Sequence, residues 1–64
     1  MEQRIEVFNG EGLLAIDMCI MNLKEFSAPQ AEQGWFIHDT STISWVDNQG
    51  QHQAKMVVIY RREA

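Results

Sequence analysis

The stretch Gly12–Phe26, GLLAIDMCIMNLKEF, decides the fold of this chain, because its apolar residues recur with the period of an α-helix. One face of the predicted helix carries a continuous apolar stripe made of Leu13, Ile16, Cys19, Ile20, Leu23 and Phe26, with Ala15 at its edge. We expect this stripe to face the core of the domain.

A second apolar stripe, formed by Leu14, Met18 and Met21, lies on the other side of the same helix. A helix on a single sheet buries only one stripe, so the second stripe predicts a partner. Self-association, a curled sheet whose gaps the methionines fill, and contact with a different protein are all open at this point. We expect Leu14, Met18 and Met21 to line an oligomer interface.

The segments around the helix are predicted from local signals. Arg4–Val7 alternates polar and apolar residues, which is typical of a half-buried strand that ends at Phe8. Asn9 is then the expected N-cap of the helix. Pro29 is expected to end the helix, because proline disrupts the helical hydrogen-bond pattern, with residues 28–34 as a connector.

The second half of the chain has the pattern of strands. Residues 35–37 and 43–46 are rich in β-forming side chains and are separated by the polar run 38–42. Residues 47–50, Asp-Asn-Gln-Gly, predict a turn, and residues 54–62 predict the last strand.

These elements predict one α+β domain over residues 1–64, with the order β-α-β-β. The sheet is expected to be antiparallel, with three strands in the order 1-3-2 and the helix packed on one face. In the last strand, Ala54, Met56, Val58 and Tyr60 share one face. Val57 and Ile59 point to the face that the helix does not cover, so we assign these two residues to a second oligomer interface.

Composition sets limits on the function. A chain of 64 residues builds a small core, so oligomer formation is a natural way to stabilise it. A net charge of −4 argues against non-specific nucleic-acid binding. The single cysteine, Cys19, fits a reducing compartment, and the chain has neither an apolar span nor a signal-peptide pattern, so we expect a cytoplasmic protein without membrane contact.

The polar run is the main candidate for chemistry. Counted by twos from Trp35, an apolar phase is interrupted by Asp39 and Ser41. Either the strand bulges there, or His38, Asp39 and Ser41 present polar groups to a ligand. Adjacent strand residues point to opposite faces, so His38 and Asp39 do not form a catalytic pair, and we expect no enzyme activity and no catalytic residue. The spacing of histidine, cysteine and carboxylate residues predicts no metal site.

One further pattern spans most of the chain and consists of Ile5-Glu6-Val7, Trp35-Phe36, His52, Met56, Val58, Tyr60-Arg61 and Glu63. In these residues the chain resembles the dodecins, small β-α-β-β proteins that assemble into hollow dodecamers and hold flavins in stacked pairs. The resemblance implies that Trp35 stacks on a flavin. The last strand also resembles a sporulation-associated family of similar length that occurs in bacteria and phages.

Two classes of function follow. The first is a non-enzymatic homo-oligomer that sequesters a planar anionic small molecule, with a nucleotide or a flavin as the candidate ligand. Trp35 at a strand end and Arg61 near it are expected to hold this ligand together with Tyr60 and the polar run, although a core position is the more common one for each aromatic ring. The alternative is a small, phage-encoded inhibitor that docks on a host protein.

Overall fold

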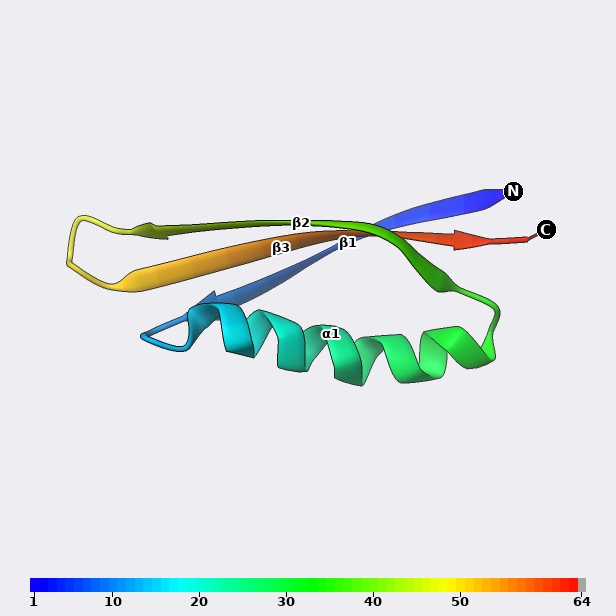
Figure 1. Ribbon diagram of the computed structural model, residues 1–64, viewed down its shortest axis with the longest axis horizontal. Coiled ribbons are helices and arrows are strands. Elements are labelled where there is room, and N and C mark those ends of the chain that lie inside the picture. Colours follow the sequence, from blue (N-terminus) through cyan, green and yellow to red (C-terminus); the bar gives the residue numbers. More distant parts are fainter. Residues whose placement is uncertain (64) are drawn as a thin grey trace.

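The computed structural model describes residues 1–63, which form three strands and one helix. Their order is β1 (Glu2–Glu11), α1 (Ala15–Glu32), β2 (Phe36–Val46) and β3 (His52–Arg62). The strands pair antiparallel in the order β1-β3-β2, and the helix lies along one face of the sheet (Figure 1). The predicted α+β fold is therefore confirmed. Ala64, the last residue of the predicted domain, lies outside the described residues.

The first strand is longer than predicted, and the expected N-cap at Asn9 is wrong. Asn9 pairs with Lys55 inside β1, and the helix begins only at Ala15, after Leu14 in a cap position without a side-chain hydrogen bond. Gly10 explains the geometry: a Cβ atom there would overlap the carbonyl oxygen of Ala15. The close approach of strand and helix backbones fixes where the helix begins.

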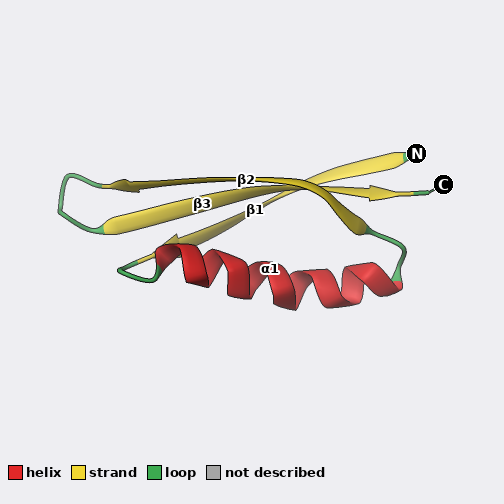
Figure 2. Cartoon of the chain, viewed as in Figure 1, coloured by secondary structure: helices red, strands yellow, loops and turns green. Residues whose placement is uncertain are grey.

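The predicted helix end at Pro29 is also wrong, because α1 continues through Pro29 to Glu32. Proline removes the hydrogen bond that the carbonyl of Glu25 would otherwise accept. Both Glu25 and Pro29 are exposed, so solvent can reach this part of the backbone. The predicted connector 28–34 is thus mostly helix, and the loops that remain are short, as the green segments of Figure 2 show.

The hairpin of β2 and β3 agrees with the sequence. The backbone N–H groups of Gln49 and Gln51 both donate to Oδ1 of Asp47, at 2.9 Å each, and Gly50 has a φ of 78°. These bonds lower the pKa of the Asp47 carboxyl, the one from Gln51 most strongly. Residues 38–42, predicted as a polar interruption, belong to the continuous strand β2.

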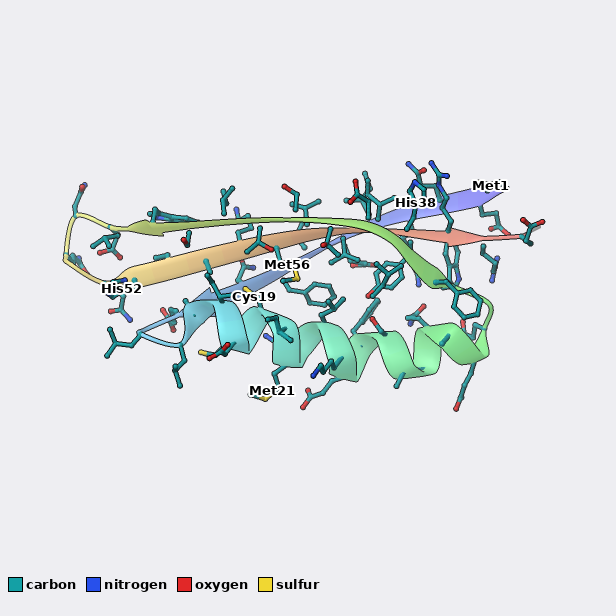
Figure 3. All side chains as sticks on the ribbon, in the orientation of Figure 1. Met1, Cys19, Met21, His38, His52 and Met56 are labelled. Atoms are coloured by element: carbon teal, nitrogen blue, oxygen red, sulfur yellow. The ribbon has the colours of Figure 1, made fainter. Side chains whose placement is uncertain are left out.

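The core lies between the helix and the two strands β1 and β3. Its buried side chains are Ala15, Cys19, Trp35, Ala54, Met56, Val58 and Tyr60. Figure 3 shows Cys19 and Met56 in the layer between helix and sheet, and Met21 pointing away from the sheet. The buried face of β3 is the predicted one. Of the predicted helix stripe, Cys19 is fully buried and Leu23 and Phe26 pack at the edge of the core, whereas Leu13, Ile16 and Ile20 are exposed.

Candidate functional site

The face of the sheet opposite the helix is the most unusual surface of the molecule. We call it the open face; strand register and side-chain alternation place on it the apolar residues Ile5, Val7, Phe36, Ile43, Trp45, Val57 and Ile59. Within residues 1–63 no element covers this face, which lies above the sheet in Figure 1. Ile5 and Ile43 are each 59% exposed. An apolar surface that spans all three strands is typical of an interaction site.

A half-buried strand is expected to turn its apolar side chains toward the helix, and β1 does the opposite. Arg4 and Glu6, which pair with the buried Tyr60 and Val58, share the face covered by the helix, while the apolar Ile5 and Val7 lie on the open face. Arg4 is accommodated under the helix by an ion pair with Glu6 at 3.5 Å and by a hydrogen bond to the side chain of Gln30. The alternation in β1 was visible in the sequence, but the face that the apolar residues would occupy was not.

The second strand is exposed at every residue. The helix packs over β1 and β3. A hollow of about 330 Å³ lies between the start of α1 and the end of β2. Leu13, Ile16 and Val46 are among its lining residues. β2 is therefore held to the domain mainly by its pairing with β3 and by the Asp47 turn.

The polar run contains the bulge that the sequence offered as one of two explanations. The register of β2 on β3 shifts between Ile37 and Asp39, so His38 is the extra residue. The shift places Asp39 and Ser41 on the open face and Ile37 on the helix side. Both Asp39 and Ser41 are exposed, which removes the difficulty of a buried carboxylate. Oδ1 of Asp39 accepts the backbone N–H of Thr40 at 2.8 Å.

The predicted geometry around Trp35 is wrong in two respects. Trp35 is only 7% exposed, so its ring is a core group and is not reachable at a strand end. The guanidinium carbons of Arg4 and Arg62 lie over its ring, at 4.5 and 4.6 Å from the ring centroid, whereas the expected partner was Arg61. The reason is strand alternation: Arg62 shares the helix side with Tyr60, whereas Arg61 points to the open face.

Arg61 has an aromatic neighbour nevertheless. Its cross-strand partner in β2 is Phe36, which is 62% exposed. Nε of Arg61 donates to Oε1 of Gln3 at 3.2 Å, and Arg62 forms an ion pair with Glu2 at 2.8 Å. A cavity of about 410 Å³ adjoins these groups, lined by Met1, Gln33, Gly34, Phe36, Arg61, Arg62 and Glu63. Phe36 belongs to the residues of the dodecin resemblance, but it was not predicted as a site residue.

The remaining predicted site residues lie apart from this cavity. Tyr60 is fully buried, and its hydroxyl shares a hydrogen bond of 2.7 Å with Oγ of Ser27, so its assignment to a ligand site is a further correction. His38 is exposed at the bulge. Leu14, Met18 and Met21 are exposed on the helix, as an interface would require, and Val57 and Ile59 are half-buried at the centre of the open face.

Among residues 1–63, no group of three or more histidine, cysteine, aspartate or glutamate side chains is placed to hold a metal ion. The helix of the described chain is not apolar enough over its length to span a membrane. Comparisons with protein-family models, with curated proteins and with solved structures give no match.

Proposed function

We propose that this protein is a non-enzymatic assembly protein, which acts as a homo-oligomer whose open face is covered by the open face of a second copy. The orientation of β1 carries the proposal: Ile5 and Val7 face away from the helix while Arg4 and Glu6 lie beneath it. Leaving branched apolar side chains in water lowers stability, and a second copy would remove that cost.

The dimensions of the open face suit a dimer. Strands of 10 or 11 residues at about 3.3 Å per residue, spaced about 4.8 Å apart, give a face of about 35 by 15 Å. Two such faces would bury about 1,000 Å², which is the lower limit for a specific interface. Sheets that pack face to face interdigitate side chains of this kind.

The charges on the open face also favour a second copy. Lys55 and Arg61 lie on its central strand, and Glu11 and Asp39 lie on its two edges. The charges of this face therefore cancel, although the whole chain carries −4. Two copies that meet through this face avoid the repulsion that their net charges would cause elsewhere.

Two matched substitutions test which surface forms the interface. Val7→Glu places a carboxylate on the open face at a side chain that is 49% exposed, and Met21→Glu does the same on the outer helix stripe at 55%. We expect Val7→Glu to reduce the mass measured by light scattering at micromolar concentration, and Met21→Glu to leave it unchanged.

The opposite pattern would assign the interface to Leu14, Met18 and Met21 and reject the open face. A wild-type protein that is monomeric at this concentration would reject self-assembly and favour the alternative of docking on a different protein. Circular dichroism of both variants checks that each subunit remains folded.

A second candidate function, binding of a planar anion such as a nucleotide or a flavin, is favoured by one observation. Phe36 and Arg61 face each other across neighbouring strands beside the cavity of about 410 Å³. A ring that stacks on Phe36 and an anionic group that accepts hydrogen bonds from Arg61 would use both side chains. The resemblance to the dodecins agrees with a flavin held by an assembly. The buried thiol of Cys19 agrees with a cytoplasmic location.

Titration with flavin mononucleotide and with adenosine monophosphate tests this candidate. Phe36→Ala and Arg61→Ala should each weaken binding by about 1 to 3 kcal/mol. Ile43→Ala removes an exposed apolar side chain from the same face, where Ile43 pairs with Lys55 and not with Arg61, and serves as the control. Binding that is equally weak in all three variants, or absent in the wild type, would rule the candidate out.

A further inference from the structure

The two edges of the sheet are protected to different degrees. The sequence of β1 is EQRIEVFNGE, with charged side chains along its length, and the helix also contacts its backbone. The amide of Asn22 donates to the carbonyl of Asn9 at 3.4 Å, and the thiol of Cys19 donates to the carbonyl of Phe8 at 3.6 Å. Charged residues and a covering helix are the usual means of preventing edge pairing.

The edge at β2 has less of this protection, because Asp39 is its single carboxylate. Its sequence FIHDTSTISWV has 11 residues with no lysine, arginine, glycine or proline, and every residue is exposed. Its single bulge lies at His38, close to one end, so the stretch from Asp39 to Val46 is a regular strand. A long exposed edge with β-branched and aromatic side chains is a template for another strand.

We propose that β2 pairs antiparallel with β2 of a second copy, around a two-fold axis that passes through Ser41, so that two sheets form one continuous six-stranded sheet. Residues that face each other across antiparallel strands lie on the same face of a sheet. A symmetric pair of identical strands must therefore have its axis at a residue and not between two residues. An axis at Ser41 meets this condition and lies near the middle of the regular stretch from Asp39 to Val46.

Charge complementarity selects Ser41 among the candidate axis positions. With the axis there, Asp39 lies opposite Ile43 of the second copy. Ile43 in turn pairs with Lys55 within its own sheet, so Asp39 and Lys55 of the second copy occupy one row of the open face. Their backbones are two strand spacings apart, about 10 Å, which the two extended side chains can span together. An axis at Thr40 or Thr42 would instead bring Asp39 into the row of Val57 or of Gln53.

The same register matches the uncharged residues. Thr40 lies opposite Thr42 of the second copy on the helix side, where threonine pairs are favourable. Beyond the bulge, Phe36 lies opposite Trp45 of the second copy on the open face. The two Asp39 carboxylates are kept apart by four residues along the strand, or about 13 Å, so like charges do not meet.

This contact uses the edge of the sheet and is independent of the open-face contact proposed above. Its axis is perpendicular to the sheet, whereas the axis between two stacked open faces lies parallel to it. Where these two axes intersect, the two contacts together build a closed tetramer with two-fold axes only.

Cysteines on the helix side of β2 test the register, because contact between open faces leaves that side outside. Thr40→Cys and Thr42→Cys proteins are purified separately, mixed in equal amounts and oxidised gently, and the products are separated by mass. We expect the mixed disulfide to exceed the two homodimeric disulfides taken together, because random pairing of equal amounts makes only half of the product mixed. The wild type is the control, since Cys19 is fully buried and should not form a disulfide.

Thr42→Lys tests the contact by size, because a lysine on an edge strand opposes pairing. We expect this substitution to halve the mass of the assembly in light scattering, and Thr42→Lys with Val7→Glu to give monomers. If the open-face proposal fails, Val7→Glu has no effect while Thr42→Lys still converts dimer to monomer, so the two failures are distinguishable.

Two results would overturn the inference. One is a mixed disulfide that does not exceed the sum of the two homodimeric products, which is the result of random pairing. The other is an unchanged mass for Thr42→Lys while Val7→Glu alone gives monomers.

Discussion

The two faces of the sheet contain similar residues in different surroundings. In β3, Met56, Val58 and Tyr60 are buried under the helix, whereas Val57 and Ile59 are half-buried on the open face. Both sets alternate along one strand and both are apolar. The difference shows that burial in this chain is decided by where the single helix lies, and that the apolar pattern of the strand exceeds what one helix can cover.

The largest effect should come from removing the aromatic ring at the centre of the covered face. Tyr60→Ala is expected to lower the free energy of unfolding by about 3 to 5 kcal/mol, because the ring is fully buried and contacts Phe26. Ile59→Ala changes the neighbouring residue on the open face and should lower the free energy of unfolding clearly less. It is made in a Val7→Glu background, in which the open face is expected to stay uncovered. Urea unfolding of both proteins measures the difference, and equal losses would contradict the distinction between the faces.

A single methyl group should be enough to disturb the covered face at the start of the helix. Gly10→Ala is expected to cost about 1 to 3 kcal/mol, because the new Cβ atom would overlap the carbonyl of Ala15 and force the backbones apart. Asn9→Ala changes the neighbouring residue on the other face and is the control. The proposed strand and helix contact would be contradicted if the two variants melted at the same temperature.

A smaller effect is expected from one hydroxyl group on each face. Tyr60→Phe removes the hydrogen bond with Ser27 and should lower the free energy of unfolding by about 1 kcal/mol. Ser41→Ala removes an exposed hydroxyl from the open face and should leave the stability of the subunit almost unchanged. Thermal denaturation of the two variants beside the wild type measures both quantities, and a larger loss for Ser41→Ala would reverse the comparison.

The smallest effect concerns the turn that holds β2 to the covered part of the domain. Hydrogen bonds from Gln51 and Gln49 lower the pKa of Asp47 in the folded state, so its carboxylate stabilises the fold above the pKa of the unfolded chain. This contribution is lost as the pH falls through the lower, folded pKa. We therefore expect Asp47→Asn to reduce the acid sensitivity of unfolding, measured by denaturation between neutral and acidic pH. An unchanged pH profile would show that the turn does not contribute.

Most of the topology could be predicted from the sequence, because it depends on local patterns. The helical period of residues 12–26, the Asp47 turn and the alternation in β3 indicate a β-α-β-β order, and short connections then favour the sheet order 1-3-2. The bulge was predictable as one of two alternatives, because Asp39 interrupts an apolar phase. Pro29 misled the prediction, since the cost of proline in a helix depends on whether the unpaired carbonyl is exposed, and exposure is a tertiary property.

The candidate site was predicted only in part, because alternation identifies the two faces of a strand without saying which face the helix covers. Val57 and Ile59 were assigned to the uncovered face correctly, but Phe36, Ile43 and Trp45 were missed as its members. The aromatic and guanidinium pair was assigned to Trp35 and Arg61, whereas Trp35 packs with Arg4 and Arg62, and Arg61 faces Phe36.

By itself, the sequence determined the elements and their order, because hydrophobic period and turn residues act over a few residues along the chain. Tertiary structure alone decided that Ile5 and Val7 face away from the helix and that β2 is exposed throughout. It also decided that Trp35 packs with Arg4 and Arg62. These features depend on how one helix is placed over three strands. That placement follows from contacts between different elements, such as the close approach of Gly10 in β1 to Ala15 in α1 and the hydrogen bond of Ser27 in α1 with Tyr60 in β3.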